Sequence, residues 1–317
     1  MKMKANWLVA LVVGFGVGLL LFFFRGGSEA PTQGIPVQFE YRDGFQEVEG
    51  WPTEADRIGA AAAVEVTPHG NVLVFRRESP NLWEVDKEGG LVREWGDQIA
   101  QWAHSVRVDR EGYLWTVDGQ GHEIKKWSAD GRELLLSLGE FGVSGDGPYH
   151  FNRPTDVAVA TNGDIFVSDG YGNSRIVRYD REGRFIMEWG RSGSGTREFD
   201  IPHSITIDSR GRILVADREN DRVQVFDVKG TLLDSLTHVG RPYGVYVTEE
   251  DLLYVADLPG ATVWIVDLDS GEIVGNVEGT DGIHWVAVDP LGNVYTASVR
   301  YTYAKKYVPQ AQVRKSH

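Results

Sequence analysis

The chain has 317 residues, 42% hydrophobic and 25% charged, which is enough apolar material for one large or two small globular domains and excludes a disordered or fibrous protein. Its formal net charge of −14 repels phosphate, so we expect no nucleic-acid partner. The absence of cysteine excludes disulfides, thiolate metal sites, iron–sulfur clusters and a lipidated cysteine anchor.

The N-terminal segment predicts a membrane helix. An unbroken apolar run from Trp7 to Phe24 would extend about 27 Å as a helix, just enough to span a hydrocarbon core. A secretory signal is the alternative, but Pro31 directly follows the nearest small-residue cleavage position, Ala30, and should hinder cleavage. We therefore expect an uncleaved anchor over residues 1–26.

Flanking charges predict the orientation of this anchor. Lys2, Lys4 and the amino terminus outweigh the single Arg25, so the N-terminus should stay in the cytoplasm. The rest of the chain should then lie outside the membrane, in the periplasm or the extracellular space. A polar linker that contains glycine and proline follows over residues 27–36.

From about Ala61 onward the chain repeats itself with a period of 40 to 50 residues, which indicates a propeller or a solenoid. Stretches 156–169 and 204–217 follow one template, in which an alternating strand, a glycine turn and a more apolar strand succeed one another. A third and a fourth strand complete each unit, as at 174–179 and 184–189. Four antiparallel strands per unit predict a propeller blade.

Six units predict an all-β fold, a six-bladed β-propeller over residues 37–308. The units begin near the following residues: Ala62, His104, Thr155, His203, Tyr243 and His284. The sixth unit ends after its third strand, near Tyr307, whereas stretch 43–50 resembles the turn and fourth strand of the other units. We therefore expect the N-terminal strand to complete the last blade and close the ring, with no helix beyond the anchor. Residues 309–317 should form a polar tail.

Histidine occupies the same first-strand position in every second unit, at His104, His203 and His284. Because first strands line the central channel, these side chains should meet at one level, about 120° apart. Three histidines with an open fourth position are typical of catalytic zinc, although imidazole also accepts iron, manganese and copper. The alternative is that they hold water or bond to neighbouring strands. The other histidines fall in turns, linkers or the tail and indicate surface positions.

The loops that follow the second strands should face the same channel end as the histidines. Blades two to five have an aspartate there, which indicates a carboxylate that ties the loop: Asp118, Asp169, Asp217 and Asp257. Blade one has two cations there instead, Arg76 and Arg77, and the guanidinium of Arg77 suits a carboxylate ligand. Blade three continues with Tyr171 between two glycines, where a nearby metal can lower the phenol pKa from about 10 so that it acts as a base. Taken singly, either side chain is typical of a surface loop.

Several stretches resemble NHL-repeat propellers, and more closely peptidyl-α-hydroxyglycine α-amidating lyase, a catalytic domain that produces peptide amides. The similarity spans most of the repeats and is densest over about 150–225. The stretches that carry it are 151–159, 167–177, 202–204 and 215–220.

This resemblance implies a function and a set of site residues. The three channel histidines would bind zinc, with Tyr171 as the catalytic tyrosine and Arg77 as the active-site arginine. A structural calcium would bind the backbone carbonyls of Val64 and Val106. The substrate would be a small molecule or peptide ending in an α-hydroxyglycine-like carbinolamide, whose C–N bond is cleaved to give an amide and glyoxylate.

The chain differs from the family at two positions of the third histidine stretch. Trp285 stands where the family has an acidic residue, and Gly282 stands where it has a methionine. We expect a monomeric, membrane-anchored zinc lyase. The alternative from another class is a non-catalytic NHL propeller that binds a protein or glycan in the cell envelope. A metal-dependent hydrolase such as a lactonase is a further alternative, but those propellers typically bind the metal through carboxylates.

Overall fold

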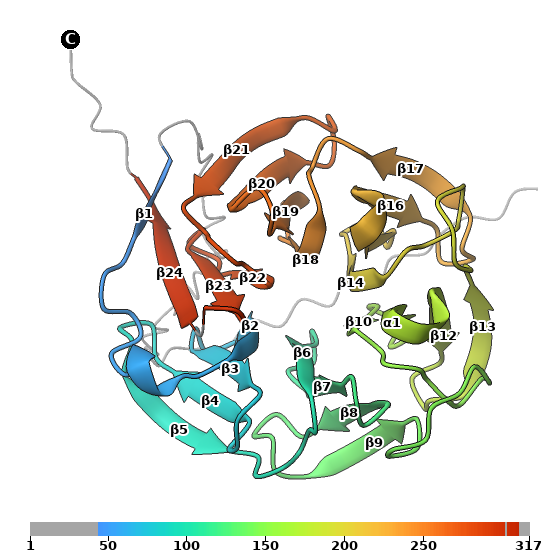
Figure 1. Cartoon of the computed structure of the whole chain (residues 1–317), viewed down its shortest axis with the longest axis horizontal. Helices are drawn as coiled ribbons and strands as arrows, with labels where there is room; N and C mark the ends of the chain where they lie inside the picture. Colours follow the sequence, from blue (N-terminus) through green and yellow to red (C-terminus); the bar gives the residue numbers. More distant parts are fainter. Residues whose placement is uncertain (1–43, 302, 311–317) are drawn as a thin grey trace, which may run out of the picture. The chain divides into compact units, whose positions relative to one another are not determined.

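The computed structural model describes residues 44–301 and 303–310. These residues form a ring of six four-stranded antiparallel sheets around a central channel (Figure 1). The first strand of each blade lies nearest the axis and the fourth lies at the rim. The prediction of an all-β, six-bladed propeller is confirmed.

The first three blades follow one another along the chain, and the strands of each succeed one another from the axis to the rim. Blade one consists of β2 (Ala61–Val66), β3 (Val72–Arg76), β4 (Leu82–Val85) and β5 (Leu91–Trp95). Blade two consists of β6 (Ala103–Val108), β7 (Leu114–Asp118), β8 (Glu123–Trp127) and β9 (Leu134–Leu138). Blade three consists of β10 (Asp156–Val159), β11 (Ile165–Asp169), β12 (Arg175–Tyr179) and β13 (Phe185–Trp189).

The last three blades continue the ring back to the N-terminal strand. Blade four consists of β14 (Pro202–Ile207), β15 (Ile213–Asp217), β16 (Arg222–Phe226) and β17 (Leu232–Leu236). Blade five consists of β18 (Pro242–Val247), β19 (Leu252–Asp257), β20 (Thr262–Asp267) and β21 (Ile273–Glu278). Blade six consists of β22 (Trp285–Val288), β23 (Val294–Ser298), β24 (Tyr303–Pro309) and β1 (Phe45–Glu47).

The two ends of the propeller meet in blade six. Strand β1 pairs antiparallel with β24, with Phe45 opposite Pro309 and Glu47 opposite Tyr307. Lys305 Nζ donates to Glu47 Oε2 at 2.9 Å across the same pair of strands. The N-terminal segment thus supplies the fourth strand that the sixth repeat lacks, and β24 ends one residue beyond the predicted boundary of 308.

Apolar side chains fill the spaces between neighbouring blades rather than one central core. Between blades four and five, for example, Leu214 and Val225 pack with Val245 and Leu253, all of them buried. Similar clusters occupy the other blade interfaces. Removal of apolar surface from water stabilises the folded chain by about 25 cal/mol per Å². The packing between the blades therefore holds the inner strands at defined positions around the axis.

The prediction that the propeller needs no helix is wrong. Three short helical turns occur within the described residues: η2 (Ala55–Arg57), α1 (Gly170–Asn173) and η3 (Arg218–Asn220). Both α1 and η3 follow a second strand and end at a residue in the left-handed conformation, Ser174 and Asp221. Such a cap lets a single helical turn lead directly into the third strand.

No helix within residues 44–301 and 303–310 is long and apolar enough to cross a membrane. The anchor predicted over residues 1–26 and the linker predicted over 27–36 lie outside the described residues, as does the tail from 311 onward.

Candidate metal centre

The three repeat-related histidines meet at one end of the central channel. Each offers one ring nitrogen, and these atoms all lie within 4.8 Å of one another. His104 and His203 have no exposed surface, and His284 is 3% exposed. The ring centroids are 4.7 to 5.2 Å apart, so the imidazoles surround one small volume.

The second nitrogen of each histidine is fixed by the next blade. His104 Nδ1 lies 2.6 Å from Thr155 O, His203 Nδ1 lies 2.6 Å from Tyr243 O, and His284 Nδ1 lies 2.6 Å from Ala62 O. A carbonyl can only accept, so each Nδ1 carries the proton and donates, and each Nε2 keeps a free electron pair. Metal-binding histidines are commonly oriented by such a bond from the non-ligating nitrogen.

The three accepting carbonyls belong to Ala62, Thr155 and Tyr243. These residues occupy the repeat position of the histidines in the three blades that have no histidine there. The ladder between the first and second strands skips this position in four blades, for instance between Ala61 and Ala63 and between Ala103 and Ser105. Such a β-bulge leaves one residue unpaired and turns it out of the ladder. In this propeller the bulge turns His104 toward the channel and leaves Ala62 O free to accept from His284.

Burial keeps all three imidazoles neutral. It lowers the pKa of His104 and His203 well below the usual value and that of His284 to about 4. The charges of Arg77 and Arg218 act in the same direction on His104 and His284. Neutral imidazole is the metal-binding form, so these residues need not lose a proton before they bind a metal.

Tyr171 lies directly against this group, on the helical turn α1. Its hydroxyl donates to His203 Nε2 at 2.9 Å and lies 3.2 Å from His104 Nε2. A Cβ added to Gly170 would lie 2.1 Å from Pro202 O, and one added to Gly172 would lie 2.2 Å from Asn152 Cγ. The two glycines are therefore required by the close approach of the turn to blade four and to the preceding loop. Burial raises the pKa of Tyr171, whereas Arg218 and Arg77 lower it.

Arg77 directly follows β3, and its guanidinium lies against the ring of Trp102, which in turn lies against the ring of Tyr171. Its guanidinium carbon lies 4.4 Å from the centroid of the Trp102 ring, and that ring lies 5.4 Å from the ring of Tyr171. Arg77 Nε is buried and has no hydrogen-bond partner in the described part of the chain. Burial lowers the pKa of Arg77, while the Tyr171 hydroxyl and Glu78 act to raise it. A bound anion would supply the missing partner.

Sequence reasoning missed a second cation at this site, Arg218. It begins η3, and its Nη1 lies 3.5 Å from Tyr171 Oη, while its guanidinium carbon lies 4.8 Å from the Tyr243 ring. The repeat contained a signal for it, because Arg218 follows Asp217 as Arg77 follows Arg76, at the same position of the unit. Trp102, which separates Arg77 from Tyr171, was also missed.

The four loop aspartates have the structural role that their recurrence predicts. Each accepts a backbone N–H from the segment that enters its own blade: Trp102 for Asp118, Asn152 for Asp169, Asp200 for Asp217 and Arg241 for Asp257. They tie the loops at the histidine end of the channel without pointing at the histidines. Among the remaining histidines, His69 and His238 are exposed, as expected for surface residues.

The donor set at the histidines fits a zinc ion. Three neutral imidazoles with converging free nitrogens match the ligands of catalytic zinc centres, and no thiolate is present to complete a closed structural site.

A calcium ion does not fit at Val64 and Val106. Val64 and Val106 occupy the same position of the repeat as Ile205 and Val245. The carbonyls of Ile205 and Val245 accept hydrogen bonds from Arg107 Nη2 at 3.5 and 3.0 Å. A divalent cation among these carbonyls would therefore lie beside a fixed positive charge.

Comparisons with known proteins agree with this architecture. The NHL repeat model matches residues 151–179 and 199–226. A probable peptidyl-alpha-hydroxyglycine alpha-amidating lyase of Caenorhabditis elegans is 27% identical over 94% of this chain and 97% of its own length. Several other lyase and monooxygenase relatives match over 40% of their length or less.

Two further similar proteins are not named as amidating lyases. NHL repeat-containing protein 3 of Mus musculus is 26% identical over 97% of each chain. A streptogramin B lyase structure superposes with a TM-score of 0.57 at 15% identity, covering 86% of this chain and 90% of that one, which shows a shared fold. The chain is thus an NHL-repeat six-bladed β-propeller homologous to the peptidyl-α-hydroxyglycine α-amidating lyases.

Proposed function

We propose that this protein is a zinc-dependent lyase that cleaves the C–N bond of an N-acyl-α-hydroxyglycine-like carbinolamide to give an amide and glyoxylate. One observation carries the proposal. Three neutral imidazoles converge within 4.8 Å, each fixed by the neighbouring blade, and the Tyr171 hydroxyl lies 2.9 Å from one of them. Homology to the amidating lyases supports the same reaction class.

The residues around the histidines match the groups of such a substrate. The His104, His203 and His284 Nε2 atoms would hold zinc, which when bound supplies a Lewis acid that polarises the substrate hydroxyl. Arg77, with its buried and unpartnered Nε, would bind the carboxylate next to the carbinol carbon. Trp102 covers one side of that guanidinium.

Tyr171 Oη would accept the proton of the substrate hydroxyl. The C–O bond then becomes the double bond of glyoxylate, and the electron pair of the C–N bond moves to the amide nitrogen. That nitrogen takes up the proton that Tyr171 accepted, which restores the tyrosine to its starting state. Atoms and charge balance without an oxidant or a second substrate. Burial raises the pKa of Tyr171, and the guanidinium groups of Arg77 and Arg218 offset part of this rise.

We further propose that the protein works as a monomer on the outer side of a membrane, held by an N-terminal anchor. The apolar run from Trp7 to Phe24 and the charges that flank it support this location. The substrate would then be a small molecule or a peptide with an α-hydroxyglycine-like C-terminus.

The first prediction concerns this reaction. Zinc-loaded protein should release glyoxylate from an N-acyl-α-hydroxyglycine faster than the spontaneous reaction, and protein freed of metal should not. Tyr171→Phe should lower kcat by roughly 100-fold because it removes the base. Arg77→Ala should mainly raise KM because it removes the carboxylate contact. Glyoxylate release over a range of substrate concentrations measures both constants.

Matched variants separate these effects from general damage. Tyr149→Phe alters a half-exposed tyrosine and Arg191→Ala an exposed arginine, and both should behave like wild type. Equal rates for zinc-loaded and metal-free protein would overturn the lyase proposal. That result would favour the alternative function, a non-catalytic propeller that binds a protein or a glycan.

A further inference from the structure

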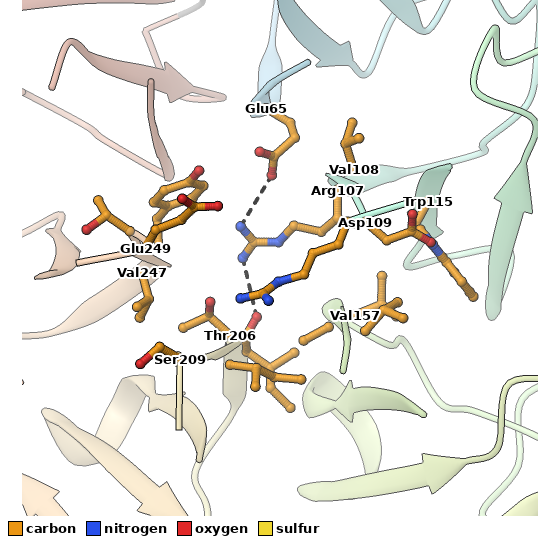
Figure 2. Close-up of a pocket in the computed structure, with 17 residues that line it drawn as sticks. Glu65, Arg107, Val108, Asp109, Trp115, Val157, Thr206, Ser209, Val247 and Glu249 are labelled. Carbon is orange, nitrogen blue, oxygen red and sulfur yellow. Dashed lines mark hydrogen bonds and ion pairs between the residues drawn. The ribbon is translucent and has the colours of Figure 1, made fainter. Parts of the chain in front are cut away.

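The guanidinium of Arg107 lies in the central channel, next to the layer of the three histidines. Arg107 is three residues beyond His104 on β6, and its guanidinium carbon lies 4.7 Å from the centroid of the Trp285 ring. A pocket of about 240 Å³ lies in the channel on the other side of Arg107 from the histidines (Figure 2). Arg107, Glu65 and Tyr246 are among the residues that line it. Arg107 therefore separates this pocket from the histidines.

This one side chain contacts every other blade of the propeller. Its partners in blades one, three, four, five and six are Glu65 (ion pair, 3.6 Å), Asp156 (2.6 Å), Ser204 Oγ (3.1 Å), Val245 O (3.0 Å) and the Trp285 ring (4.7 Å). Figure 2 shows Glu65 and Arg107 pointing toward each other from neighbouring blades. We call this group the Arg107 cluster. No single blade interface could hold all of these partners, so the cluster depends on the closed ring.

Of the two carboxylates of the cluster, Glu65 and Asp156, the second has hydrogen-bond donors on both oxygens. Asp156 is fully buried, and its Oδ1 accepts from Arg107 Nε at 3.1 Å and from Val157 N at 2.8 Å. Its Oδ2 accepts from Arg107 Nη2, from Ser204 Oγ at 2.8 Å and from Ile205 N at 2.9 Å. Burial acts to lower the pKa of Arg107, but Asp156 and Glu65 together with Tyr246 raise it above its usual value.

The ring of Trp285 offers the channel a surface that suits a guanidinium. An aromatic face attracts a cation and is preferred by arginine, whereas calcium binds oxygen ligands. Trp285 is fully buried, follows His284 directly and stacks on its ring at 6.0 Å between centroids. The indole face and the guanidinium of Arg107 therefore form a pair inside the channel.

We propose that Arg107 is the protein's own channel cation: its guanidinium joins the six inner strands from the axis and occupies the place of a structural calcium. The propeller therefore folds and keeps its histidines in position without calcium. This role of Arg107 in the scaffold does not depend on the proposed lyase reaction.

Thermal unfolding of the whole protein tests the proposal. Millimolar calcium chloride should shift the Tm of wild type by no more than the same concentration of magnesium chloride does. Arg107→Met, which keeps the length of the side chain but not its charge, should lower Tm by about 10 °C, since it leaves Asp156 buried without its cation. Arg107→Lys should fall between the two. Arg110→Met, in an exposed neighbour that lines the same pocket, should leave Tm unchanged.

Three results would each overturn the proposal. The first is a rise in the wild-type Tm that calcium causes and magnesium does not. The second is stoichiometric calcium in the purified protein by elemental analysis, and the third is an Arg107→Met variant as stable as wild type. If Arg107→Met fails to fold, the calcium measurements on wild type still decide the question.

Discussion

At the scale of single residues, the site depends on which nitrogen of each histidine is free. Each Nδ1 donates to a carbonyl of the next blade at 2.6 Å, so the three Nε2 atoms face one another as acceptors. Three buried acceptors without a donor of their own are costly, and the Tyr171 hydroxyl satisfies only part of this need. A metal ion would satisfy it completely.

Metal content tests this arrangement directly. Purified protein should hold about one transition-metal ion per chain, and each of His104→Ala, His203→Ala and His284→Ala should lose most of it while staying folded. His69→Ala, in an exposed turn, serves as the control and should keep its metal. Elemental analysis with circular dichroism on the same samples gives both quantities. Stoichiometric metal in the triple variant would contradict the assignment.

At the scale of the element, short helical turns after the second strands bring Tyr171 and Arg218 over the histidines. Each turn follows an aspartate that ties the loop, and in blade four this is Asp217. Asp217 is fully buried and accepts from Arg222 Nε at 2.8 Å and from Asn220 Nδ2 at 2.9 Å, the last residue of η3. It therefore positions Arg218 without touching the site.

Replacing this aspartate should affect stability and substrate binding together. Asp217→Ala should cost about 1–3 kcal/mol of unfolding free energy, because buried donors lose their acceptor. It should also raise KM about tenfold, because η3 no longer holds Arg218 beside Tyr171. The matched control is Asp257→Ala in blade five, whose following loop contributes no residue to the described site. Equal changes of KM in both variants would show that Asp217 has no specific positioning role.

At the scale of the whole molecule, the ring is closed by strand β1, and two features depend on closure. The Nδ1 bond of His284 reaches Ala62 in blade one, and the Arg107 cluster contacts all the other blades. Blade six contributes His284 and contains the junction between β1 and β24. Loss of the closing strand should therefore disturb the site as well as the rim.

Two truncations distinguish the closing strand from the segment before it. Removal of residues 1–26 should leave a folded propeller with the Tm of the full chain. Removal of residues 1–50 deletes β1 and exposes the edge of β24, so this variant should unfold at a clearly lower temperature and aggregate more readily. Calorimetry and light scattering report these outcomes. The same Tm for both truncations would mean that β1 does not stabilise the ring.

The sequence by itself determined the six repeats, the closing strand and the alternation of the three histidines, because strand alternation and repeat position define which residues face the channel. Tyr171 and Arg77 could also be found this way, since each departs from the repeat in a loop at the histidine end. Only the tertiary structure decided the rest. The Nδ1 bonds join residues up to 222 positions apart, and long side chains such as those of Arg107 and Arg218 reach partners in other blades. Which partners they reach depends on rotamers and on distances across the closed ring, and neither is encoded in the period of one repeat.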